Sequence, residues 1–110
     1  AIERLGYQAV LSDREEEIRS ADKVIFPGVG EASSAMSKLR ETGLDKVIPT
    51  LTQPVLGICL GMQLMCTGSE EGDTIGLDIF NVDVVRFRES YHAQPYNPFC
   101  RKMFIKMCIE

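Results

Sequence analysis

The sequence lacks the features that mark membrane, secreted and nucleic-acid-binding proteins. No apolar run approaches the roughly 18 residues that a membrane helix requires, and the N-terminus lacks the cationic and then apolar order of a signal peptide. Twelve Lys and Arg against sixteen Asp and Glu give a net charge of −4, so no basic surface argues for nucleic acid or for an anionic membrane. We therefore expect a cytoplasmic protein whose partner is a small molecule or another protein.

Cysteine is present, but its pattern predicts neither disulfides nor a metal site. The four residues are Cys59, Cys66, Cys100 and Cys108, and their spacings give neither a CxxC pair nor the paired spacing of zinc ligands. We therefore expect free thiols in a reducing compartment, without a bound metal or cofactor.

The remaining composition is ordinary for one globular domain, with 110 residues, 45% hydrophobic and 25% charged. Two short apolar runs, residues 24–26 and 55–58, indicate buried strands of a parallel sheet. Apolar residues recur at helical spacing over residues 32–43, 44–51 and 60–66. Strands that alternate with helices indicate an α/β fold with a parallel sheet.

The flanking segments carry weaker patterns. Residues 2–5 followed by Gly6 fit a helix end, residues 7–11 a short strand, and residues 12–19 an acidic helix with a capping box of Ser12 and Glu15. Residues 69–73 fit a polar loop, and residues 83–88 alternate like a half-exposed strand. Residues 91–110 show no clean period, and we assign them no role.

The pattern most informative about chemistry is Gly57-Ile58-Cys59-Leu60-Gly61, where a predicted strand passes into a predicted helix. A nucleophile flanked in this way lies on a tight, strained turn, because side chains at the flanking positions would collide with neighbouring backbone. The N-terminus of the helix favours a thiolate over a thiol. The alternative is that Cys59 is an inert buried thiol and that both glycines serve helix-to-strand packing.

A second glycine-rich turn, Pro27-Gly28-Val29-Gly30, follows the other predicted strand. Because the carboxyl ends of parallel strands share one sheet edge, we expect this turn beside Cys59, where ligands of open α/β sheets bind. Its backbone N–H groups, with that of Leu60, could hold a developing oxyanion. The alternatives are a structural turn or a phosphate cradle, although neither the dinucleotide-binding nor the P-loop pattern occurs.

Together, VIFPGVG at residues 24–30 and PVLGICLGMQL at residues 54–64 resemble the class I (triad) glutamine amidotransferases. The resemblance covers residues 1–88 and is strongest for the glutaminase subunits of histidine biosynthesis. This closer match rests on PGVG at residues 27–30 and LGICLGMQLM at residues 56–65, together with residues 1–7, 69–72 and 84–87. It implies a flavodoxin-like, doubly wound parallel sheet of which this chain represents the N-terminal half.

The resemblance also implies a role for each residue of the two motifs. Cys59 is the nucleophile that attacks the side-chain carboxamide of L-glutamine and releases ammonia. Gly28, Val29, Gly30 and Leu60 form the oxyanion hole, and Gly30 and Gln63 bind the glutamine. Gln63 lies one turn after Cys59 on the same helix face, although without the resemblance we would place it on a solvated helix surface. The implied partner is a (β/α)8-barrel cyclase subunit in a heterodimer.

The sequence departs from this family in three respects. The family takes its general base and the carboxylate that orients it from a late His-x-Glu element, whereas the single histidine here, His92, is followed by Ala93 and Gln94. The family's first strand and the second half of its sheet are missing, so we expect an uncovered sheet edge and poor solubility or aggregation of the isolated chain. Residues 1–88 then form a partial amidotransferase domain and residues 89–110 a divergent tail, as a truncated gene, a frameshift or a partial sequence would each explain.

Two other functions stay open from the sequence. The chain could be an inactive remnant or an interaction protein that keeps part of the fold without the base. It could also be another cysteine-elbow member of the same superfamily, such as a peptidase-like or chaperone-like protein. Gln63 and the turn at residues 27–30 argue against the second alternative, because a glutamine there suits the binding of a free amino acid.

Overall fold

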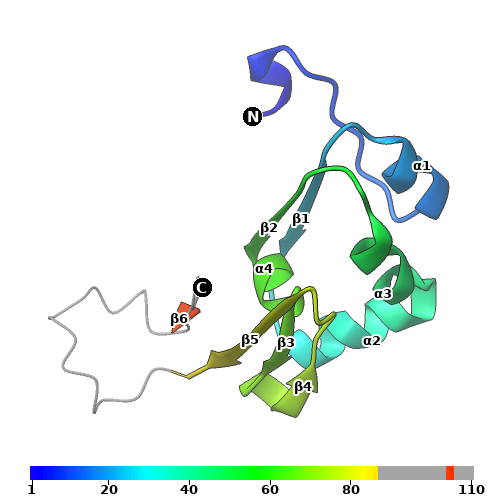
Figure 1. Cartoon of the computed structure of the whole chain (residues 1–110). Coiled ribbons are helices and arrows are strands. Elements are labelled where there is room, and N and C mark those ends of the chain that lie inside the picture. The colour runs from blue at the N-terminus through cyan, green and yellow to red at the C-terminus, as the bar shows by residue number, and fades with distance from the viewer. Residues whose placement is uncertain (87–103, 106–110) are drawn as a thin grey trace, which may run out of the picture.

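The computed structural model describes residues 1–86 and 104–105, and it shows a mixed α/β arrangement built around two small sheets (Figure 1). The helices are α1 (Glu15–Ser20), α2 (Ala32–Thr42), α3 (Leu44–Val47) and α4 (Leu60–Leu64), and short 3₁₀ turns cover Glu3–Leu5, Ile48–Thr50 and Glu71–Asp73. The strands are β1 (Val24–Gly28), β2 (Val55–Cys59), β3 (Cys66–Ser69), β4 (Thr74–Ile75), β5 (Phe80–Val85) and β6 (Phe104–Ile105).

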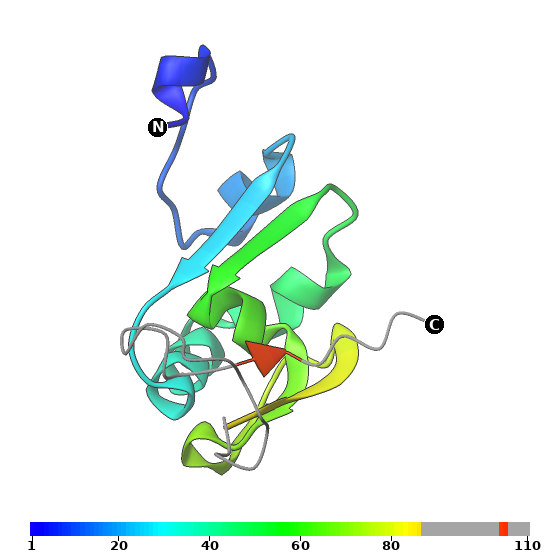
Figure 2. The ribbon, with the colours of Figure 1, turned by 90° about the vertical axis from the view of Figure 1, so that its left-hand side faces the viewer.

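The first sheet consists of β1 and β2, which run parallel from Val24 opposite Val55 to Gly28 opposite Cys59 (Figure 2). The N–H of Val24 donates to the carbonyl of Pro54 at 2.9 Å. The N–H and C=O groups of Val24, Phe26 and Gly28 therefore point toward β2, and those of the residues between them point away. Pro27 falls at an outward-facing position, where its missing N–H removes no bond between the two strands. This pair confirms the predicted parallel strands.

The core lies on one face of this sheet, between the strands and helices α2, α3 and α4. Helix α2 buries Ala32, Met36 and Leu39, which recur at helical spacing along one stripe, and it ends at Gly43 with φ of 77°, as the sequence predicts. Buried residues of α3, the following turn and α4 complete the cluster: Leu44, Val47, Ile48, Leu60 and Leu64. Helix α4 contacts both sheets and so connects the two halves of the fold (Figure 1).

The opposite face of β1 and β2 is exposed. Ile25, Leu56 and Ile58 point to this side, with 43%, 58% and 46% of their surface accessible. Successive side chains of a strand point to opposite faces of the sheet. The apolar runs predicted strands that are buried on both faces. Within the described residues, only one face of these strands is covered.

The second sheet has the strand order β4-β3-β5-β6, in which β3 and β5 are parallel and the outer pairs are antiparallel. The helix expected over residues 60–66 ends earlier than predicted. The polar loop expected over residues 69–73 lies between β3 and β4, and it includes the 3₁₀ turn Glu71–Asp73. Helix α4 ends at Leu64, and Cys66 already pairs with Phe80 in β3. The strand predicted over residues 83–88 lies earlier, as β5, and the proposed tail of residues 89–110 falls outside the described residues except for β6.

Two predictions for the N-terminal segment were also wrong. Residues 7–11 form no strand, because no strand edge in the described structure pairs with them. The capping box is absent, since α1 begins at Glu15 with Arg14 as its N-cap and without a side-chain cap. The hydroxyl of Ser12 instead accepts the Arg14 N–H at 3.0 Å and donates to Glu17.

Candidate active site at Cys59

The centre of the candidate site is Cys59, which ends β2 and forms the N-cap of α4. Its backbone has φ of 55° and ψ of −118°, a conformation that side-chain-bearing residues rarely adopt. Strained residues of this kind cost about 1–3 kcal/mol and persist where the surrounding structure fixes them. The strand-to-helix turn therefore has the strained geometry expected of a nucleophile elbow, and it leaves Cys59 exposed.

The two flanking glycines make this turn sterically possible. A Cβ on Gly57 would lie 2.7 Å from Cα of Met62, and a Cβ on Gly61 would overlap the carbonyl oxygen of Phe26 and lie 2.7 Å from its carbon. Both distances are shorter than real Cβ atoms show, and the obstacles are backbone atoms that cannot rotate away. The collision predicted from the sequence for side chains at these positions is thus present at both.

The end of β1 lies directly beside the elbow. Gly28 is the register partner of Cys59, and a Cβ on Gly28 would lie 3.0 Å from both the Leu60 Cβ and the Gly61 nitrogen. The chain then leaves β1 through Val29, which is 92% exposed, and Gly30, whose φ is 107°. The structure therefore brings Gly28, Cys59 and Leu60 together at the carboxyl edge of the parallel pair.

Gln63 follows Cys59 by one turn of α4, and its side-chain oxygen has an unusual environment. Oε1 is buried and accepts no hydrogen bond from any described residue. A buried acceptor without a donor lowers the stability of the fold by about 1–3 kcal/mol. Such atoms commonly accept a hydrogen bond from a water molecule or a bound ion. Among the described residues, Gln63 Oε1 is therefore an unpartnered acceptor with almost no accessible surface, one helical turn after Cys59.

The second described cysteine lies in a contrasting environment. Cys66 is 1% exposed, and its thiol donates to the carbonyl of Met62 at 3.5 Å. Burial raises the pKa of the Cys66 thiol, and the negative charge of Asp83 raises it further. Cys66 is thus a packing residue, whereas Cys59 is the described thiol that a reactant can reach.

Sequence reasoning missed one polar residue next to the site. Glu31 follows Gly30 and is the N-cap of α2, where its carboxylate accepts the hydroxyls of Ser33 and, at 2.9 Å, of Ser34. These hydrogen bonds hold the pKa of the Glu31 carboxyl below its usual value. The available signal was an acidic residue directly before Ala-Ser-Ser, because serine hydroxyls two and three positions later can donate to its carboxylate.

Three further expectations from the sequence concern the single histidine, a metal site and a membrane helix. His92 lies outside the described residues, so the structure does not place the single histidine. Within the described ranges, no group of three or more His, Cys, Asp or Glu side chains could hold a metal ion. No helix in that part of the chain is long and apolar enough to cross a membrane.

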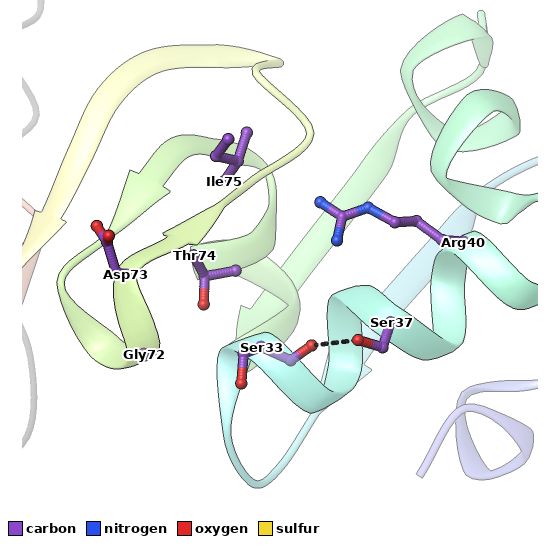
Figure 3. A pocket seen from close by; sticks show the side chains of 7 residues that line it. All are labelled: Ser33, Ser37, Arg40, Gly72, Asp73, Thr74 and Ile75. Carbon is purple, nitrogen blue, oxygen red and sulfur yellow. Dashed lines mark hydrogen bonds between the residues drawn. The ribbon is translucent and has the colours of Figure 1, made fainter.

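A separate hollow of about 210 Å³ lies between α2 and the turn that leads into β4 (Figure 3). Helix α2 contributes Ser33, Ser37 and Arg40, and residues 72–75 form the other wall. The hydroxyls of Ser33 and Ser37 already donate to Glu31 and to the Ser33 carbonyl. The lining includes none of the residues gathered around Cys59.

Comparison with known proteins agrees with this geometry. A model of the SNO glutamine amidotransferase family matches residues 1–109. The imidazole glycerol phosphate synthase subunit HisH of Bacteroides thetaiotaomicron is 59% identical over 92 residues, which cover 84% of this chain and 47% of that protein. HisH of Bacteroides fragilis is 55% identical over 94 residues, which cover 86% of this chain and 48% of that protein. HisH of Haemophilus influenzae is 44% identical over 108 residues, which cover 98% of this chain and 54% of that protein. The chain spans about half the length of the curated relatives it matches.

Proposed function

The chain belongs to the SNO glutamine amidotransferase family, and from this premise we propose that its sequence carries the nucleophile half of a glutaminase site. The substrate is L-glutamine, and the products are glutamate and ammonia. The observation that carries the proposal is the strained backbone of Cys59 between two glycines that admit no side chain, beside the end of β1. Strained residues of this kind cluster at active sites, which supports a catalytic role for Cys59.

The reaction begins at the Sγ atom of Cys59. The thiolate attacks the carboxamide carbon of L-glutamine, and the electron pair of the C=O bond moves to its oxygen. The Leu60 N–H and the backbone of residues 28–30 stabilise this oxyanion. When the intermediate collapses, the C–N bond breaks, the nitrogen leaves as ammonia after taking a proton, and a glutamyl thioester remains. Water then hydrolyses the thioester and restores the thiol.

The remaining groups follow from the chemistry of this reaction. Gln63, which follows Cys59 by one turn of α4, holds the bound amino acid, and Gly30 gives the glutamine access to the backbone of the oxyanion turn. The proton for ammonia needs a general acid, and residues 1–86 contain no histidine. We therefore assign that group to a part of the protein outside these residues.

The names of the relatives support a finer proposal. Each is a subunit of imidazole glycerol phosphate synthase, so the ammonia would pass to a (β/α)8-barrel cyclase subunit. That partner makes imidazole glycerol phosphate and an aminoimidazole carboxamide ribotide in histidine biosynthesis. The complete sheet would be flavodoxin-like and doubly wound, with helices on both faces of β1 and β2. The free thiols Cys59 and Cys66 fit a cytoplasmic location.

A chimera tests the proposal, because it supplies the half of the relatives that this chain does not span. The matched segment of the Bacteroides thetaiotaomicron subunit is replaced by the corresponding residues of this chain, and glutamate release is measured with that organism's own cyclase subunit. We expect glutaminase activity that Cys59→Ala lowers by about 10³-fold or more, as loss of a covalent nucleophile does. Cys66→Ala is the matched control and keeps the activity.

Circular dichroism and a melting curve show whether the chimera folds. A folded chimera that releases no glutamate, or one whose activity survives Cys59→Ala, contradicts the proposal. The first of these outcomes would favour the alternative of a remnant or interaction protein.

A further inference from the structure

The turn that follows β1 carries two backbone donors that the described structure does not use. Gly28, at the start of this turn, is fixed by its pairing with Cys59 in the sheet. Neither the Val29 N–H nor the Gly30 N–H donates to another described residue, so both are available to an oxyanion. Gly30 has a φ of 107°, and a glycine restrains its own backbone little. The direction of these N–H groups therefore depends on what holds the next residue, Glu31.

Glu31 is held through both its side chain and its backbone. Its Oε1 accepts the hydroxyl of Ser33, and its Oε2 accepts the hydroxyl of Ser34 at 2.9 Å. The carbonyl of Glu31 also accepts the N–H of Ala35 at 3.1 Å, as the N-cap of α2. Because α2 engages both carboxylate oxygens and the carbonyl, Glu31 cannot rotate without breaking these hydrogen bonds.

The other side of the Glu31 carboxylate faces the 3₁₀ turn Glu71–Asp73. Figure 3 shows Gly72 of this turn opposite the start of α2. A Cβ on Gly72 would lie 2.6 Å from Oε1 of Glu31, so the carboxylate packs directly against the Gly72 backbone. The turn has a support of its own, since the Glu71 N–H donates to the hydroxyl of Ser69 at 3.1 Å. Glu31 thus lies between α2 and a second fixed part of the structure.

We propose that Glu31 is a positioning residue, which fixes the Gly30 backbone so that the turn after β1 presents its N–H groups to the oxyanion formed at Cys59. This inference rests on the proposed glutaminase function. Glu31 acts through the turn and not on the substrate, because hydroxyls of the chain engage both of its carboxylate oxygens. The attack on glutamine and the hydrolysis of the thioester both pass through an oxyanion. Loss of Glu31 should therefore slow turnover whichever step limits the rate.

Steady-state kinetics of the glutaminase chimera, assayed with its cyclase subunit, tests this role. Glu31→Ala should lower kcat by about tenfold or more, because small misplacements of catalytic groups cost up to about 10²-fold, while KM stays within about twofold. Glu31→Gln keeps the length of the side chain and one acceptor oxygen, so it should restore most of kcat. The matched control is Glu41→Ala, which removes an exposed carboxylate near the other end of α2 and should change neither constant.

Alkylation of Cys59 by iodoacetamide separates positioning from general damage to the site. The thiolate displaces iodide from a saturated carbon in this reaction, so no oxyanion forms. Glu31→Ala should therefore leave the rate of Cys59 alkylation unchanged, whereas a distorted elbow would alter it. If Glu31→Ala fails to fold, the double variant Ser33→Ala/Ser34→Ala removes both hydroxyl donors with residues that favour a helix. Its kcat should fall by about threefold or more.

The outcomes distinguish this inference from the function on which it rests. A folded wild-type chimera that releases no glutamate overturns the proposed function and this inference with it. In an active chimera, a Glu31→Ala variant whose kcat matches that of Glu41→Ala overturns the positioning role alone. The same holds if the alkylation rate of Cys59 falls in parallel with kcat, or if the double serine variant keeps the wild-type kcat.

Discussion

At position 61, the backbone carbonyl of Phe26 leaves no room for a side chain. Because the obstacle is backbone, Gly61→Ala must push β1 and α4 apart, and we expect a loss of about 3 kcal/mol or more in the free energy of unfolding, at the high end for overpacked sites. Gly68→Ala is the control, since a Cβ there would come no closer than 3.3 Å to another atom. Urea denaturation of both variants measures the difference. Equal losses would mean that the elbow is not held by this close approach.

Gln63 separates stability from ligand binding at a single residue. Replacing it with leucine removes a buried acceptor that has no described donor, so Gln63→Leu should leave the free energy of unfolding unchanged or raise it by about 1 kcal/mol. The same change should abolish any protection of Cys59 by L-glutamine. A clear loss of stability in urea denaturation would show that Oε1 has a structural partner, and would remove the support for a role in binding.

The two described thiols should differ strongly in reactivity. Cys59 is exposed, whereas Cys66 is almost fully buried and has a raised pKa, so a smaller fraction of it is thiolate at any pH near 8. Under native conditions, iodoacetamide should alkylate Cys59 at least about tenfold faster than Cys66. Peptide mass spectrometry over a time course measures both rates. Comparable rates would indicate that the segment around β3 opens readily.

At the scale of elements, the start of α2 should respond to pH through Glu31. Hydrogen bonds from the hydroxyls of Ser33 and Ser34, and from the Ser34 backbone, lower the pKa of this carboxyl from its ordinary value of 4.5. A lowered folded-state pKa means that the stabilisation is fully present above about pH 4.5 and is lost as the pH falls through the folded-state value. Melting temperatures of the wild type and Glu31→Gln should therefore differ at pH 7 and converge in acid. A difference that is independent of pH would contradict this assignment.

Elements whose pattern is local could be predicted from the sequence. The strands β1 and β2, the end of α2 at Gly43 and the turn at Cys59 each follow from residues within a few positions, because burial, a positive φ and glycine spacing are local requirements. Their side-by-side placement followed from the rule that strands joined by a helix run parallel.

Elements that depend on distant partners could not be predicted. Residues 7–11 have a strand pattern but no edge that pairs with them. The start of β3 at Cys66 depends on Gly76, where a Cβ would lie 3.0 Å from the Leu64 carbonyl and closer still to that of Cys66. The helical spacing of residues 60–66 gave no sign of that approach. The burial of Gln63 Oε1 likewise arises from packing and not from sequence spacing.

At the scale of the whole molecule, the described residues present a parallel strand pair that is covered on one face, with the exposed thiol of Cys59 at its carboxyl end. The helices cover one face of β1 and β2, while Ile25, Leu56 and Ile58 stay exposed on the other (Figures 1 and 2). The chain spans about half the length of its curated relatives. The strand-to-helix turn at Cys59 is therefore formed by contacts close to it, although one face of the sheet beside it is exposed.

Affinity labelling of the chain tests most directly whether the Cys59 elbow binds and attacks glutamine. The chain is treated with 6-diazo-5-oxo-L-norleucine, a diazoketone that replaces the carboxamide of glutamine, and the adducts are located by peptide mass spectrometry. We predict an adduct on Cys59 whose formation excess L-glutamine slows by about tenfold or more, while L-asparagine has no effect. Labelling of Cys59 at a rate that L-glutamine does not change, or equal labelling of Cys59 and Cys66, would contradict the account.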